Sequence, residues 1–475
     1  MVFTSVEFLI CFLPVVLGMY FCLPRRAKNG WLLLASLFFY AWGEPKFVLV
    51  MLGSILFNYL LALAVSATRD RPRRALAFLI LAIAGNLSVL FLYKYANFVT
   101  SVARSVFQGY AGAIPQTSFV LPLGISFFTF QAMSYVIDVY RGVPAQRNPL
   151  KIALYIALFP QLVAGPIVRY STVRDQIDRR TVTWDSFAGG VYRFLIGFNK
   201  KMLLANLFGV TADRVFAIAE PSCGFAWLGA AAYTFQIFFD FSAYSDMAIG
   251  LGAMFGFRFQ ENFNYPYVSK TVTEFWRRWH ISLGCWFRDY VYFPLGGSRV
   301  GRGRLVLNLA VVWLLTGLWH GANWTFILWG VLYGALIMFE KLGAVPARVD
   351  AHPVLRAVYQ PFTMLMVILG WVLFRSETLA QAGTFLQAMF LGADGGATSW
   401  DHVVFEFNEC RVVLVCGILC STPMFARLSA WCVRRFPRSE AALAASGWLW
   451  QMVLLVVSVS FLAMNAHNPF IYFNF

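Results

Sequence analysis

Long apolar segments alternate with short polar connections along most of the chain. Segments of roughly 17–25 apolar residues can cross a bilayer as helices, so the pattern predicts an all-α polytopic membrane protein with about 10–13 membrane segments. The candidate segments are 5–23, 30–43, 46–66, 75–99, 118–137, 150–168, 187–208, 224–251, 305–318, 322–341, 354–374, 410–432 and 446–465. The first has no basic residue before its apolar run, so we expect a retained span rather than a signal peptide.

Composition and charge agree with this prediction. Of the 475 residues, 60% are hydrophobic and 13% are charged, whereas a soluble domain has about 25% charged residues. The net charge is +16, and basic clusters lie in the short connections PRRAKN (24–29), TRDRPRR (68–74) and VRRFPRSE (433–440). Such clusters are typical of cytoplasmic loops, so we expect contacts with membrane lipids and none with nucleic acid. No connection is long enough for a separate soluble domain, which predicts a single membrane domain over residues 1–475.

Polar residues inside the apolar segments need a separate explanation, because buried polar groups at membrane depth are costly. Two interpretations remain open: hydrogen bonds that join neighbouring helices, or a polar interior that lines a passage. The helical spacing of Gln131 and Asp138, and of Gln236 and Asp240, places each pair on one face. The whole set is Gln131, Asp138, Gln161, Gln236, Asp240, Asp246 and Asn323.

The segment WRRWHISLGCWFRDYVYFPLGG (276–297) combines aromatic rings with charged groups. On one continuous helix, two stripes would form. The first contains Trp276, Trp279, Leu283, Trp286 and Tyr290, and the second contains Arg277, His280, Gly284 and Arg288. Arginine binds phosphate oxygens bidentately, so the second stripe fits either lipid headgroups at the interface or a phosphorylated substrate.

The segment TGLWHGANWTFILWG (316–330) places His320 between apolar runs and before two small residues, Gly321 and Ala322. A histidine in this context is either a hydrogen-bonded structural residue or a neutral base that faces a cavity. The chain has no G-x-S-x-G, P-loop or H-E-x-x-H motif, and neither His280 nor His320 is followed by aspartate five residues later. The eight cysteines form no C-x-x-C pair, so we expect neither a metal site nor a disulfide framework.

Several long motifs resemble those of membrane-bound O-acyltransferases, in particular the branch that acetylates alginate and related polysaccharides. They are the two histidine segments, FPQLVAGPIVRY (159–170), DFSAYSDMAIGLG (240–252) and MVFTSVEFLICFLPVVLGMY (1–20), and the resemblance extends to the closing NPFIYFNF. It implies a ring of helices around a central funnel, with His320 as the catalytic histidine and His280 in support. It also implies donor contacts in the segment that holds Trp276, Trp279, Arg277 and Arg288, with no bound cofactor and acetyl-CoA as the acyl donor.

The function that this resemblance implies is transfer of an acetyl group from cytoplasmic acetyl-CoA across the bacterial inner membrane. The acceptor would be an extracytoplasmic polysaccharide such as alginate, with His320 as general base and a periplasmic SGNH-type acetyltransferase as partner. One alternative is transfer of another acyl group, such as D-alanyl from a carrier protein, and a more remote one is a transporter or flippase. Members of the alginate branch can carry histidine where this chain has Gln161, which weakens alginate as the specific polymer.

The ending NPFIYFNF (468–475) has four aromatic rings and no charged side chain. One interpretation is an aromatic anchor at the membrane interface. Related D-alanylating systems have a small companion protein whose end resembles this one, which implies that Tyr472 could relay the acyl group as a phenyl ester.

Overall fold

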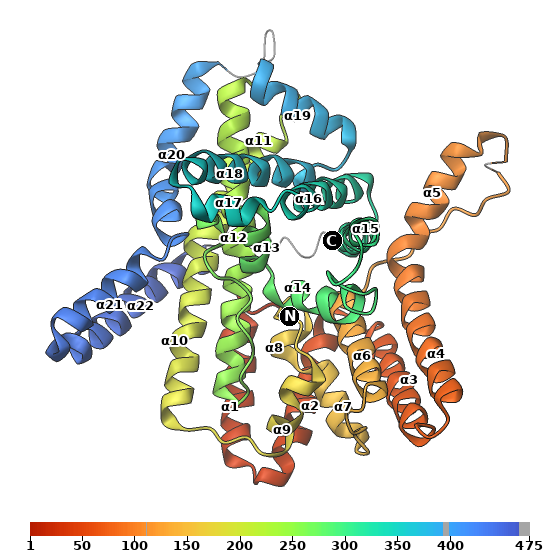
Figure 1. Ribbon diagram of the computed structural model, residues 1–475. Coiled ribbons are helices and arrows are strands. Elements are labelled where there is room, and N and C mark those ends of the chain that lie inside the picture. Colours follow the sequence, from red (N-terminus) through yellow and green to blue (C-terminus); the bar gives the residue numbers. More distant parts are fainter. Residues whose placement is uncertain (111, 393–398, 465–475) are drawn as a thin grey trace. The chain divides into compact units, whose positions relative to one another are not determined.

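Helices make up all the regular structure in the computed structural model, which describes residues 1–110, 112–392 and 399–464 (Figure 1). No strand occurs among these residues, and the prediction of an all-α polytopic membrane protein is confirmed. Contacts within the chain divide it into two compact units. The first contains residues 1–193 and 247–260, and the second contains 194–246 and 261–475. The expectation of one membrane domain over residues 1–475 stays a prediction.

The first unit is built from the N-terminal helices. They are α1 (Leu13–Cys22) with the preceding π-helix η1 (Glu7–Phe12), α2 (Arg25–Gly43), α3 (Val48–Ala67), α4 (Pro72–Leu90), η2 (Phe91–Tyr95), α5 (Ala96–Val106), η3 (Gln108–Tyr110), α6 (Ile125–Tyr140), α7 (Pro149–Ala157), α8 (Phe159–Leu162), α9 (Tyr170–Asp178) and most of α10 (Trp184–Lys200). Helices α3 and α4 pack together, and buried Asn58 and Asn86 exchange side-chain hydrogen bonds of 3.0 and 2.7 Å between them. This pair shows one use of polar residues in apolar helices, which is to join neighbouring spans.

The second unit contains both histidine motifs. Its helices are the end of α10, η4 (Lys201–Ala205), α11 (Asn206–Phe216), most of α12 (Cys223–Met254), η5 (Pro266–Val268), α13 (Val272–Arg278), α14 (Ile281–Phe287), η6 (Arg288–Tyr292), α15 (Arg302–His320), α16 (Trp324–Leu342), α17 (Val345–Ala351), α18 (Pro353–Arg375), α19 (Leu379–Leu391), α20 (Trp400–Cys420), α21 (Met424–Arg435), η7 (Pro437–Ser439) and α22 (Glu440–Ala463). Its core is rich in aromatic rings, and Trp329 and Tyr333 of α16 are fully buried in it.

Fewer helices than expected could cross a membrane by length and composition alone. Six qualify among the described residues, and a seventh if α20 and α21 count as one span bent by 55°. This bend falls inside the expected segment 410–432. The expected segment 150–168 is also broken, because α7 ends at Ala157 and the short α8 leads into irregular chain. The expected 10–13 membrane segments include interrupted segments of this kind, which do not qualify as full spans by length and composition.

Glycines let α15 and α16 approach each other closely. A Cβ atom added at Gly317 would lie 2.5 Å from the carbonyl oxygen of Phe326, and one added at Gly330 would lie 2.6 Å from that of Trp313. Only glycine permits such backbone contact between helices. The contact fixes the last turn of α15, which ends at His320.

Candidate active site

Helix α13, the start of the first histidine motif, has an N-terminus whose backbone donors are satisfied by side chains. The first N–H groups of a helix have no partner within it. The Thr271 hydroxyl accepts from Glu274 N at 3.1 Å, as an N-cap does. The buried Glu340 carboxylate of α16 accepts from Val272 N at 2.8 Å and from Thr273 N at 2.7 Å. The Glu340 carboxylate of α16 therefore stabilises the N-terminus of α13, the helix that precedes His280.

The expectation of one continuous helix through the first histidine motif is wrong. Helix α13 ends at Arg278 and α14 begins at Ile281. Between them, His280 has a left-handed backbone with φ of 44°, a conformation that is uncommon outside glycine. Asn262 holds this break, because its carbonyl oxygen accepts from Ile281 N at 3.0 Å and its Oδ1 accepts from Ser282 N at 3.1 Å. The two stripes expected on a single helix do not form.

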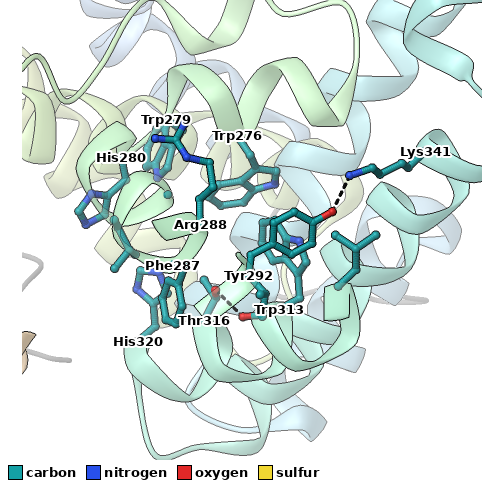
Figure 2. Close-up of a pocket in the computed structure, with 14 residues that line it drawn as sticks. Trp276, Trp279, His280, Phe287, Arg288, Tyr292, Trp313, Thr316, His320 and Lys341 are labelled. Carbon is teal, nitrogen blue, oxygen red and sulfur yellow. Dashed lines mark hydrogen bonds between the residues drawn. The ribbon is translucent and has the colours of Figure 1, made fainter. Parts of the chain in front are cut away.

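After the break, α14 continues into the π-helix η6, a type of segment that often occurs at functional sites. Arg288 opens η6 and Tyr292 closes it, and both line one cavity. Lys341, at the end of α16, lines it as well and donates to the Tyr292 hydroxyl at 2.8 Å. Figure 2 shows Lys341 and Tyr292 on one side of the cavity and the two motif histidines on the other.

His320 reaches the same cavity from the end of α15. Its side chain is buried, and its ring centroid lies 4.9 Å from that of Trp319, 5.0 Å from Trp329 and 5.1 Å from Phe374. The indole of Trp319 also lies 5.8 Å from the His280 ring. Two imidazoles from motifs about 40 residues apart thus share one aromatic environment, which can support acid–base chemistry away from bulk water.

The cavity has a volume of about 190 Å³. Its wall is largely aromatic, with Trp276, Trp279, Phe287 and Trp313 among its lining residues, and its polar groups include both histidines, Arg288, Thr316 and Lys341. A mainly apolar cavity with a few convergent polar groups is the usual form of a small-molecule site. The chemistry that this set of groups can perform is proton transfer at the histidines and anion binding at the two cations.

Burial controls the charge of His280. Removal from water lowers the pKa of its imidazole to about 3, because a low-dielectric surrounding disfavours the charged form. The ring is therefore neutral at physiological pH. Its Nδ1 lies 3.2 Å from Asn262 Oδ1, whereas its Nε2 is buried and has no hydrogen-bond partner among the described residues.

Of the expected site residues, Trp276, Trp279, His280, Arg288 and His320 line the cavity together. Arg277 and Asn323 are among the expected residues that do not line it. Arg277 is exposed and is absent from the cavity lining. Asn323 is the N-cap of α16, where its Oδ1 accepts from Thr325 N at 3.2 Å and its amide donates to the carbonyl of Glu377. These hydrogen bonds give Asn323 a structural role at the start of α16.

The expected acidic residues of α12 form ion pairs with two consecutive lysines, one pair buried and the other partly buried. Lys201 Nζ lies 2.6 Å from Asp240 Oδ1, and Lys200 Nζ lies 2.5 Å from Asp246 Oδ2. Lys200 also bonds to the hydroxyl of Ser242 at 3.2 Å. These contacts join the end of α10 and the start of η4 to α12, which favours the interpretation of helix–helix contacts for this part of the polar set.

The remaining expected residues lie elsewhere. Gln236 is buried in the second unit, and Gln131, Asp138 and Gln161 are buried in the first. Gln161 donates to the carbonyl of Tyr155 at 2.6 Å. Neither amide atom of Gln131 has a hydrogen-bond partner among the described residues. Tyr472 lies outside the described residues.

Several residues of the site were not anticipated from the sequence. Asn262 is one residue within ENFNYPY, a segment with no helical or strand period, and only its contacts with His280 show its place. Glu340 and Lys341 end a long apolar run, a position that is typical of charged residues at a membrane boundary. The signal that could have identified Glu340 is a carboxylate directly after Phe339, still inside the apolar periodicity of that run.

Comparison with known proteins finds a family model that covers both histidine motifs. A model of the membrane-bound O-acyltransferase (MBOAT) family matches residues 77–380. A protein of Azotobacter vinelandii named probable alginate O-acetylase AlgI is 41% identical, with all of both chains covered. A peptidoglycan O-acetyltransferase of Helicobacter pylori is 33% identical over all of this chain and 98% of its own. A teichoic acid D-alanyltransferase of Bacillus subtilis is 32% identical over 48% of this chain and 62% of its own.

Proposed function

The chain belongs to the membrane-bound O-acyltransferase family and is an O-acyltransferase, and we propose that it transfers an acetyl group from acetyl-CoA to a cell-envelope polysaccharide. In this proposal the donor binds from the cytoplasmic side of the bacterial inner membrane, and the acceptor is an extracytoplasmic polymer such as alginate. Two of the relatives described above are named as acetylating enzymes of envelope polymers. The cavity that His280 and His320 share is the observation that carries the proposal.

The proposed chemistry is attack of a hydroxyl oxygen on the thioester carbonyl. A C–O bond forms and the C–S bond breaks. His320 takes the hydroxyl proton as general base and then gives this proton to the leaving thiolate, which becomes the thiol. A positioned base of this kind contributes roughly 10²–10⁴-fold in rate.

The size of the cavity supports a short acyl group. Its volume of about 190 Å³ is a little larger than an engineered protein cavity of about 150 Å³ that binds benzene. An acetyl group with its reacting hydroxyl fits such a space. A D-alanyl group is only a few atoms larger, so volume alone does not separate these two donors.

Charge at the cavity supports a phosphorylated donor. Arg288 and Lys341 both line it, and each can donate to phosphate oxygens. Arg288 is bonded to its neighbour Asp289 at 2.9 Å and remains 51% exposed, so its guanidinium is accessible to a ligand. In the proposal, Trp276 and Trp279 form the apolar wall beside the donor.

Delivery to the polymer requires more than this chain in the proposal. The sequence contains no serine-esterase motif, so a periplasmic SGNH-type acetyltransferase would complete the transfer. The Tyr472 hydroxyl would relay the acyl group as an ester, because a phenol with a pKa of about 10 loses its proton more readily than a sugar hydroxyl. Tyr472→Phe keeps the ring and removes only the hydroxyl. Loss of polymer acetylation in this variant supports the relay, and normal acetylation excludes it.

D-alanyl transfer from a carrier protein is the second candidate, because a teichoic acid D-alanyltransferase matches part of the chain. Transport is a weaker third, since it leaves the two histidine motifs without a role. Inside-out membrane vesicles that contain the protein, its periplasmic partner and the polymer separate these functions. We expect radiolabelled acetyl-CoA, added without any carrier protein, to label the polymer. Label that appears only with a D-alanyl carrier protein would favour the second candidate, and no label from either donor would contradict both.

A further inference from the structure

Asn262 forms hydrogen bonds with the two residues that follow His280 and contacts the His280 ring. Its backbone carbonyl accepts from Ile281 N, and its Oδ1 accepts from Ser282 N at 3.1 Å and from the Ser282 hydroxyl at 2.9 Å. Its amide nitrogen donates to the Ser245 hydroxyl at 3.0 Å, which ties the residue to α12. Asn262 is itself fully buried. These contacts fix both the strained backbone of His280 and the orientation of the Asn262 amide.

The orientation of this amide decides which imidazole nitrogen carries the proton. A backbone N–H is always a donor, so the atom that faces Ser282 N must be the carbonyl oxygen of Asn262. The same oxygen lies 3.2 Å from His280 Nδ1. Two acceptors at this distance would repel each other, so Nδ1 must carry the hydrogen. In a neutral imidazole the other nitrogen, Nε2, is then an acceptor.

The Ser282 hydroxyl offers a competing arrangement as a donor to Nδ1, and its geometry is poorer. Its hydroxyl lies 3.4 Å from His280 Nδ1 but 2.9 Å from Asn262 Oδ1. The single hydroxyl proton therefore lies on the shorter contact, toward Asn262. The hydroxyl oxygen can then accept from Nδ1–H as well, so Ser282 reinforces the same tautomer.

The unprotonated Nε2 remains the polar atom of His280 that is available to a ligand. It is buried and has no hydrogen-bond partner among the residues that the structure describes, and His280 lines the cavity. The ring is held in place by Phe241, edge-to-face at 4.5 Å. A buried acceptor without a partner costs free energy, which a bound O–H or N–H donor would recover.

We infer that Asn262 is a positioning residue that fixes His280 as the Nδ1–H tautomer and directs the Nε2 lone pair into the cavity, where it accepts a hydrogen bond from an O–H or N–H group of the bound substrate. The inference rests on the proposed function only for the identity of that substrate. The proposed function assigns the base to His320, and this assignment adds a second imidazole in a defined state. Asn262 acts through His280 and does not touch the substrate.

Nitrogen NMR on the full-length protein in nanodiscs, with isotope-labelled histidine, tests the tautomer without any activity. The chain has five histidines, and the His280 signal is the one that His280→Asn removes. Asparagine is chosen because it tolerates a left-handed backbone. We expect a protonated Nδ1 and an unprotonated Nε2 in the wild-type protein. We also expect this preference to weaken in Asn262→Ala. A protonated Nε2 in the wild type would overturn the inference.

Kinetics then test whether the tautomer matters. Asn262→Ala should lower kcat by on the order of 10²–10⁴-fold, as a wrong imidazole tautomer does in other enzymes, with a smaller effect on KM for acetyl-CoA. Asn199→Ala is the matched control, because Asn199 is a buried asparagine of the same unit that bonds to Gln451. Near wild-type turnover is expected for this control. Equal losses in the two variants would contradict a role specific to Asn262.

Asn262→Asp keeps the inference testable if the alanine variant does not fold. A carboxylate accepts from the same donors, so activity should be partly retained, but its charge raises the pKa of His280. His280 Nε2 accepts a hydrogen bond only while the imidazole is neutral, so the acidic limb of the kcat profile should move to higher pH. An unchanged profile would count against His280 as the acceptor. The ionisable groups on the packed elements and around the cavity include Asp240, Tyr244, Asp246, Glu261, Arg288, Tyr292, His320 and Lys341.

The two proposals fail in different ways. If the protein transfers no acyl group from any donor, the proposed function fails while the NMR tautomer is still measured. If acyl transfer is normal but His280 has the opposite tautomer, only the inference about Asn262 fails.

Discussion

Gly317 of α15 and Gly330 of α16 lie in direct backbone contact, since a Cβ atom added at Gly330 would be 3.1 Å from the Gly317 Cα and 2.6 Å from the Trp313 carbonyl oxygen. The contact lies within one turn of His320 and one residue from Trp329, whose ring contacts the histidine. The position of His320 in the second motif therefore depends on this contact between α15 and α16.

Gly330→Ala should destabilise the protein by about 1–3 kcal/mol, the usual effect of overpacking, and should lower acyl transfer as His320 moves. The measurement is the unfolding temperature of the purified protein together with its activity. Gly303→Ala, also on α15, is the control, because a Cβ there meets no atom within 4 Å. Alanine is the better helix former, so this variant should be as stable as the wild type or more so. Similar behaviour of the two variants would show that the close contact is unimportant.

Glu340→Ala should destabilise the segment that carries His280. The change removes the acceptors of Val272 N and Thr273 N, and each buried donor left without a partner costs about 1–3 kcal/mol. Glu340→Gln keeps one acceptor oxygen and should be intermediate in unfolding temperature. Glu377→Ala changes an exposed glutamate and should have little effect. An unfolding temperature of Glu340→Ala equal to that of Glu377→Ala would exclude the capping role.

Arg288→Gln should raise KM for acetyl-CoA, because Arg288 lines the cavity and each charged contact to phosphate contributes about 1.5–3 kcal/mol, or roughly 10- to 100-fold. Arg277→Gln is the matched control, since Arg277 lies in the same motif but is exposed and outside the cavity lining. Steady-state kinetics with varied acetyl-CoA decide between them. A fall in kcat with unchanged KM, or equal effects of both substitutions, would contradict donor binding by Arg288.

The buried His280 should make the folded protein less stable at acidic pH. Its pKa in the folded protein is about 3, below the ordinary value of 6.5. Between these two pH values, His280 binds a proton in the unfolded chain and stays neutral in the folded protein. The contribution of neutral His280 to the free energy of unfolding is complete above pH 6.5. As the pH falls toward 3, the free energy of unfolding decreases by up to about 1.4 kcal/mol per pH unit. Replacement by asparagine removes the titration.

The measurement is the unfolding temperature of the wild type and of His280→Asn between pH 7.5 and 5. Their difference should shift in favour of the variant as pH falls. The control His352→Asn removes an exposed histidine and should show no such shift. A constant difference between wild type and His280→Asn would mean that His280 titrates alike in both states.

The sequence predicted the helical class and both histidine motifs, because apolar segments and long motifs are local patterns. It did not predict the break at His280, since helical spacing alone favours a continuous helix and only the contact with Asn262, 18 residues earlier, stabilises the left-handed residue. Likewise, the aspartates of α12 were visible as buried charges, whereas their pairing with Lys200 and Lys201 depends on tertiary packing. Residues far apart in the chain complete the site, and local sequence periodicity does not predict which distant residues come into contact.

The most direct test of His320 as the base is the acetyl ester content of the polysaccharide from cells in which the gene for His320→Ala replaces the wild-type gene. We expect these esters to be almost absent, because loss of the base lowers the acyl-transfer rate by roughly 10²–10⁴-fold, with the variant present in the membrane at the wild-type level. His352→Ala, which removes an exposed histidine outside the cavity lining, should leave acetylation normal. Near-normal acetylation with His320→Ala would contradict His320 as the base.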